Sequence, residues 1–137
     1  MGVTRFLLDT NMAGHYINRR QGGFDRARLE VANGNPVGIG VPVLAELVAG
    51  IEHSSSRDRN TKRLKTAMTS FRLWPFDSSA AFEYGRIYAE VARLGRPIGV
   101  VDTMIAAIAM TLGNCTVVSS DSDLRVVPRL NVEDWRA

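Results

Sequence analysis

The sequence is short of the residues that form disulfides, zinc sites and membrane spans. Cys115 is the only cysteine, which excludes an internal disulfide and favours a reducing compartment. Because only His15 and His53 could join Cys115 as nitrogen and sulfur ligands, a zinc site is disfavoured. No apolar run is as long as a membrane-spanning helix, and the first residues lack the form of a signal peptide. We therefore expect a soluble, cytoplasmic protein without a membrane partner.

Lysine is also scarce. Lys62 and Lys65 are the only lysines among 17 basic residues, so arginine carries most of the positive charge. The balance is mildly basic, with a formal net charge of +3. Guanidinium groups bind phosphate well, so this composition permits a nucleic-acid partner. It does not require one, because a genome-wide bias produces the same composition and the excess charge is small.

Short apolar runs alternate along the chain with longer segments whose apolar residues recur at helical spacing. Strands are expected at residues 5–8, 37–41, 72–76, 116–119 and 129–132. Helices are expected at residues 11–20, 24–33, 42–52, 57–71, 79–94 and 102–112. The early strands are apolar throughout, which is typical of parallel strands covered by helices on both faces. The pattern predicts one α/β domain over residues 1–137, with right-handed crossovers.

Four acidic residues stand where an expected strand ends or an expected helix begins. Asp9 and Asp121 follow apolar strands, and Glu46 and Asp102 lie in early turns of apolar helices. A charge within an apolar segment costs free energy unless it is paired or binds a metal. In an open parallel sheet, ligands gather beyond the carboxyl ends of the strands. If the fold brings the four acids together, they form an oxygen-rich site for Mg²⁺ or Mn²⁺.

Each acid also has a purely structural explanation. Asp9 could cap the helix that follows it, and Asp102 could be a first-turn acid stabilised by the helix dipole. Glu46 could face solvent. Asp121 could be an ordinary turn residue, and Asp123 could take its place in a site. The four acids taken together, rather than any one of them, indicate a metal site.

Several segments resemble those of PIN-domain ribonucleases and, more narrowly, of the VapC toxins of bacterial type II toxin–antitoxin pairs. The segments that carry the acids are Phe6–Asn11, Val41–Leu47, Asp102–Ala107 and Val117–Asp121. The middle segment Leu73–Asp77 and the closing segment Pro128–Trp135 are also similar to the family. Any one segment is a weak signal, but the ordered set spans nearly the whole chain and is specific.

The resemblance implies a PIN-like three-layer α/β/α sandwich with a central, mainly parallel sheet. It also implies a Mg²⁺-dependent endoribonuclease, with Mn²⁺ as the alternative ion, in which a metal-activated water hydrolyses the phosphodiester bond. Asp9, Asp102 and Asp121 would be metal ligands in such a site. Glu46 would be a further ligand or the base that orients the water.

Smaller polar residues correspond to positions that orient the ligands in the family. These are Asn11 and Ser119, with Asp123 as a third candidate. The last motif departs from the family pattern, because many relatives have Thr in place of Ser119 and Phe in place of Leu124. Whether Asp121 or Asp123 completes the site therefore stays open.

RNA phosphates would need positive contacts outside the acidic centre. Arg19 and Arg20 follow the first expected helix and are the candidates for RNA binding. The basic run from Arg57 to Lys65 could serve the same purpose, although a solvated helix face is the simpler explanation.

The resemblance further implies a cognate antitoxin protein, whose tail would occupy the groove, and a homodimer formed through the central helices. Tyr84, Tyr88 and Met68 could serve that dimer, although core packing explains them equally well. An aspartyl phosphatase of the haloacid type fits poorly, because Asn11 stands where that chemistry needs a second acid. The alternative to an enzyme is a catalytically silent PIN-like module that binds RNA or protein. The presence of all four acids argues against it.

Overall fold

The computed structural model describes residues 2–20 and 22–136. The strands are β1 (Arg5–Leu8), β2 (Val37–Gly40), β3 (Arg72–Trp74), β4 (Cys115–Val118) and β5 (Asn131–Glu133). The helices are α1 (Thr10–Ile17), α2 (Gly23–Ala32), α3 (Val41–Glu52), α4 (Arg57–Met68), α5 (Ser78–Arg93), α6 (Val100–Leu112) and the 3₁₀ helix η1 (Ser122–Val126).

The five strands form one sheet in the order β3-β2-β1-β4-β5, and every neighbouring pair is parallel. The chain runs outward from β1 through β2 to β3 and then returns to place β4 on the other side of β1. The strand order therefore reverses between β1 and β4, which is where open parallel sheets bind their ligands.

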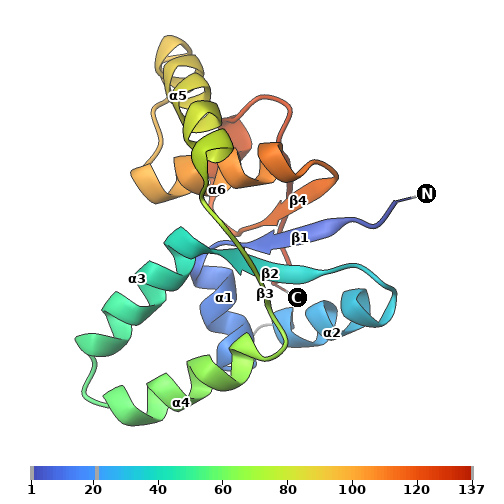
Figure 1. Ribbon diagram of the computed structural model, residues 1–137, viewed down its shortest axis with the longest axis vertical. Coiled ribbons are helices and arrows are strands. Elements are labelled where there is room, and N and C mark those ends of the chain that lie inside the picture. The colour runs from blue at the N-terminus through green and yellow to red at the C-terminus, as the bar shows by residue number, and fades with distance from the viewer. Residues whose placement is uncertain (1, 21, 137) are drawn as a thin grey trace.

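Helices cover both faces of this sheet. Figure 1 shows α5 and α6 on one side of the strands and α1, α2 and α4 on the other. The expected three-layer α/β/α sandwich is confirmed. Parallel strands need such crossover helices, because each connection must return to the same end of the sheet.

The core lies between the sheet and its two helical layers. Strands β2 and β4 are buried at every residue, as their unbroken apolar sequences predict. Leu7, Ile39 and Val117 have no exposed surface, and α6 buries Ile105 and Ile108 against them in the same cluster. The core thus fixes the two central strands, and these hold the carboxyl edge of the sheet in place.

Two boundaries near the site differ from expectation. Helix α6 begins at Val100, so Asp102 lies inside its first turn. Residues 122–126 form η1, where no helix is expected, and the last strand starts only at Asn131. Arg129 has a positive φ of 68°, which a strand residue does not adopt.

Within the described part of the chain, none of the helices has the length and apolar character needed to cross a bilayer.

Candidate metal centre

Asp9 lies directly beyond β1 and has two structural partners. Its Oδ1 accepts a hydrogen bond from the backbone N–H of Met12 at 2.8 Å, which makes it the N-cap of α1. Its Oδ2 accepts a hydrogen bond from the hydroxyl of Ser119 at 2.5 Å. The residue is only 5% exposed. Asp9 therefore caps α1, as its structural explanation expects, and its role in a metal site stays a prediction.

Ser119 joins the two central strands at this edge. It follows β4, is fully buried, and donates to Asp9 while its oxygen accepts from the N–H of Asp121 at 3.0 Å. Asp121 in turn caps η1, because its Oδ1 accepts from the N–H of Asp123 at 2.9 Å. A chain of hydrogen bonds thus orients the acids of β1, β4 and η1 relative to one another.

Three carboxylates come close enough to share one cation. Oxygens of Asp102, Asp121 and Asp123 lie within 4.8 Å of one another. This set contains both Asp121 and Asp123, which the sequence offered as alternatives for completing the site. Asp9 stands beside the set rather than in it. It lies near enough to Asp121 and Asp102 for its charge to raise the pKa of Asp102 and for the charge of Asp121 to raise its own pKa.

Burial and crowding alter the ionisation of these acids. The pKa of Asp102 is raised to about 6, first by burial and then by repulsion from Asp121, Asp9, Asp123 and Glu46. The pKa of Asp9 is also raised by burial, although its hydrogen bonds from Ser119 and Met12 act in the opposite direction. Negative charges held together in a partly buried site destabilise one another. A divalent cation would remove that repulsion.

The chemistry of the donors suits a hard cation. The clustered groups are carboxylates, and Mg²⁺ and Mn²⁺ prefer oxygen ligands. Zinc would favour histidine and cysteine, and Cys115 lies in β4 with its pKa raised to about 12 by burial. The residues at the carboxyl edge of the sheet therefore fit the expected class of metal.

Glu46 stands on α3 at the open side of the centre. It is exposed, and its Oε1 accepts a short hydrogen bond from the hydroxyl of Thr10. Thr10 is the site residue that sequence reasoning missed. Its position directly after Asp9, at the start of a helix, was the available signal. By contrast, Asn11 is exposed and makes no side-chain hydrogen bond to the described acids.

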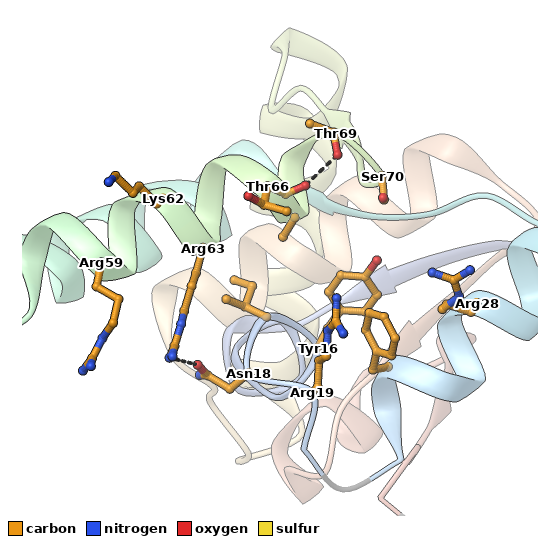
Figure 2. A pocket seen from close by; sticks show the side chains of 13 residues that line it. Tyr16, Asn18, Arg19, Arg28, Arg59, Lys62, Arg63, Thr66, Thr69 and Ser70 are labelled. Atoms are coloured by element: carbon orange, nitrogen blue, oxygen red, sulfur yellow. Dashed lines mark hydrogen bonds between the residues drawn. The ribbon is translucent and has the colours of Figure 1, made fainter.

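The two arginines expected to bind RNA follow α1 and are both exposed. Arg19 has a positive φ of 53°, and its guanidinium lies 4.5 Å from the centre of the Phe24 ring. It lines a cavity between α1, α2 and α4 (Figure 2), whereas Arg20 is not among the residues that line that cavity. Their contact with RNA remains a prediction.

Comparison with known families shows a match over most of the chain. The model of the family described as PIN domain matches residues 6–130. The "tRNA(fMet)-specific endonuclease VapC" of Shigella flexneri is 33% identical over 133 residues, which cover 97% of this chain and 99% of that protein. "Ribonuclease VapC2" of Rickettsia felis is 27% identical and covers 95% of this chain and 97% of its own length.

Solved structures show the same fold. The crystal structure of VapBC2 from Rickettsia felis bound to a promoter DNA fragment aligns with a TM-score of 0.88 and 28% identity, over 96% of this chain and 99% of that chain. DNA-bound VapBC from Salmonella typhimurium aligns with a TM-score of 0.87 and 31% identity, over 97% and 99%.

Proposed function

The chain belongs to the PIN domain family and, within it, to the VapC-type ribonucleases, and on this basis we propose that it is a metal-dependent endoribonuclease that acts as the toxin of a toxin–antitoxin pair. The relatives from Shigella flexneri and Salmonella typhimurium are both named as tRNA(fMet)-specific endonucleases. This transfer RNA is therefore the first substrate to test.

One observation above all supports the proposal. The pKa of Asp102 is raised to about 6 by burial and by four neighbouring carboxylates that come from separate parts of the chain. A fold selected only for stability would gain by replacing some of these acids. Their joint presence at the switch point of the sheet is accounted for if they bind a cation that takes part in the reaction.

Asp102, Asp121 and Asp123 would hold the ion, with Asp9 as a ligand on the β1 side. When bound, a divalent ion polarises a phosphate oxygen and lowers the pKa of a water molecule. The water would add to phosphorus while the bond from phosphorus to the 3′ oxygen breaks. The products are a 5′-phosphate and a 3′-hydroxyl.

The remaining side chains position the reacting groups. Thr10 holds one oxygen of Glu46, which leaves the other able to accept a proton from the attacking water. Ser119 fixes the position of Oδ2 of Asp9 by donating a hydrogen bond to it. Ser119 would thus have the orienting role expected of it, and Thr10 would take the one expected of Asn11.

The test is cleavage of RNA by the purified protein with Mg²⁺, with Mn²⁺ and with a chelator. Asp9→Asn should reduce the rate by at least about a hundredfold, because the amide supplies no negative charge to the ion. Its oxygen can still accept from Met12, so the protein should remain folded. Asp58→Asn removes an exposed carboxylate on α4 and is the matched control.

The outcome separates the enzyme from the alternative, a catalytically silent PIN-like module. Cleavage that needs the metal and is lost in Asp9→Asn supports the enzyme. RNA binding without cleavage under every metal condition would support the silent module.

The toxin role calls for a cognate antitoxin and for a second subunit. Solved structures that are similar to this chain include VapBC complexes. A small open reading frame for a DNA-binding antitoxin directly upstream would support the pairing, as would copurification of its product. For a homodimer, Tyr88 is 59% exposed on α5, whereas Tyr84 and Met68 pack partly against the core.

A further inference from the structure

A strongly basic cavity of about 560 Å³ lies between α1, α2 and α4. Five cations line it: Arg19, Arg28, Arg59, Lys62 and Arg63. None of the residues that line it is acidic. Figure 2 shows Arg63 reaching from α4 toward Asn18 of the α1 end, with Arg28 on α2 at the other side. More than the protein's whole net charge of +3 is therefore gathered in one cavity.

The cations of this cavity lack carboxylate partners within the described residues. Other arginines of the chain do have them, since Arg26 pairs with Glu30 and Arg57 pairs with Glu52. In the cavity, Arg63 donates only to the amide oxygen of Asn18, at 3.2 Å. Like charges held together without counter-charges repel one another, so the cavity is suited to an anion.

The spacing on α4 separates this cavity from an ordinary solvated face. Lys62 and Arg63 come three and four residues after Arg59, and Thr66 comes four and three residues after them, so all four share one face of α4 and line the cavity. Lys65 belongs to the same basic run but is not among the lining residues. Only part of the basic run is therefore a solvated helix face, and the other part lines the cavity.

The basic cavity continues toward the acidic centre. A second cavity of about 290 Å³ shares Ile17, Asn18 and Arg63 with it. This second cavity also contains Thr10 and Glu46, the hydrogen-bonded pair at the open side of the metal centre. Arg63 therefore stands between an acidic end and a basic end of one path.

We propose that this basic cavity binds the backbone phosphates of the RNA strand that flanks the scissile bond. The inference rests on the proposed ribonuclease function. Arginine forks match phosphate oxygens, and the hydroxyl groups of Thr66, Thr69 and Ser70 offer further donors to phosphate and ribose. An RNA strand cut at the acidic centre must leave that centre along some surface. The path through Arg63 supplies a cationic surface for that strand.

An acidic peptide is the rival occupant, because carboxylates would also neutralise the cations. The path favours RNA over such a peptide. The second cavity leads to Thr10 and Glu46, beside which the proposed ribonuclease would cut RNA, whereas Arg63 is the one cation among its lining residues that could hold a peptide carboxylate.

The experiment compares two double variants of α4 that remove the same charge. The cavity variant, Arg59→Gln with Arg63→Gln, removes two of the cations that line the cavity. The control, Arg57→Gln with Lys65→Gln, removes two cations of α4 that do not line it. Both are made in the Asp9→Asn background so that the RNA stays intact. Affinity for a single-stranded RNA of about 12 nucleotides is measured by fluorescence anisotropy between about 50 and 200 mM salt.

The cavity variant should bind RNA about tenfold more weakly at low salt, and its slope of log affinity against log salt should fall by about 1.4 for two lost contacts. The control should stay within about twofold of the background protein. Equal weakening in the two double variants would overturn the proposal, because only overall charge would then matter. Unfolding curves of both variants establish that neither loss reflects a folding defect.

A second probe identifies the rival occupant. If the cavity variant bound RNA normally but lost affinity for a glutamate-rich peptide, the cavity would be a peptide site and the proposal would be wrong. Failure of the ribonuclease function is distinguishable, because it appears as absence of Mg²⁺-dependent cleavage by the wild type. If the wild type cleaves RNA normally and the two double variants bind RNA with equal affinity, only the RNA-binding role of the cavity is overturned.

Discussion

Asp102 carries a clear electrostatic cost at the residue scale. It lies in the first turn of α6, where the helix dipole favours a negative charge. Burial and four neighbouring carboxylates nevertheless raise its pKa to about 6. The local helix effect is therefore outweighed by the tertiary surroundings, and the metal-free protein should be sensitive to pH.

Stability of the metal-free protein should fall as pH rises. The pKa of Asp102 is about 6 when folded against 3.8 for an ordinary Asp, so the folded state binds more protons between these values. The stabilisation is complete below the lower value and is lost as pH rises through the higher one. Allowing for partial exposure, the loss should be about 1–2 kcal/mol.

Asp102→Asn tests this directly. The amide cannot ionise, so the variant should be about 1 kcal/mol more stable than wild type at pH 8 in a chelator, with a flatter pH profile. It should also lose cleavage. Thermal unfolding across the pH range measures the first effect, and a variant that is less stable at every pH would contradict it.

Ser119→Ala should weaken the metal centre without removing any charge. Loss of the hydroxyl raises the pKa of Asp9 further and leaves the N–H of Asp121 without its partner. We expect Mg²⁺ affinity to fall by roughly ten- to a hundredfold and the acid limb of the cleavage profile to move to higher pH. Ser119→Thr keeps the hydroxyl and should restore much of both. An unchanged Mg²⁺ dependence in the alanine variant would count against this role.

At the scale of elements, the local pattern of apolar residues predicts where most helices and strands lie. It does not predict the residues at which they begin and end. The apolar strands β1, β2 and β4 and the helices on either side occupy the expected segments. The 3₁₀ helix η1 was not predictable from periodicity, because five residues carry no complete helical repeat. Its cap by Asp121 depends on the bond of that residue to Ser119.

The pairing of β2 with β3 brings the backbone of Arg72 close to Gly38. In the sequence, the glycine itself is the only sign of this contact. A Cβ on Gly38 would lie 2.1 Å from the carbonyl oxygen of Arg72. Gly38→Ala should therefore lower the free energy of unfolding by about 1–3 kcal/mol. Gly85→Ala, inside α5 with nothing within 4 Å of the new atom, should raise it by about 0.5–1 kcal/mol. Chemical denaturation measures both, and equal effects would refute the steric explanation.

At the scale of the whole molecule, charge is divided between two neighbouring regions. The acidic centre collects carboxylates from β1, α3, α6 and the end of β4, and the basic cavity collects cations from α1, α2 and α4. The segments that meet are far apart in the sequence, as the bond from Ser119 to Asp9 illustrates. This arrangement places a cationic surface suited to an RNA strand beside the acidic metal centre.

The outer face of α5 should form the proposed homodimer. Phe82 is 82% exposed there, which is unusual for so large an apolar side chain. Phe82→Arg should weaken self-association at least about tenfold, because a buried charge would need a partner. Leu29→Arg, at an exposed site on α2, is the control and should not change association. Analytical ultracentrifugation gives the answer, and a monomeric wild type at micromolar concentration would contradict the dimer.

The sequence by itself determined the layered α/β architecture and the four principal acids. Apolar runs and helical spacing are local properties, and the order of the acids along the chain carries the family resemblance. Only the tertiary structure decided that Asp123 joins Asp102 and Asp121, that Thr10 holds Glu46, and that half of a basic helix lines a cavity. These are contacts between side chains on different elements. Their geometry depends on how the elements pack, which no local pattern records.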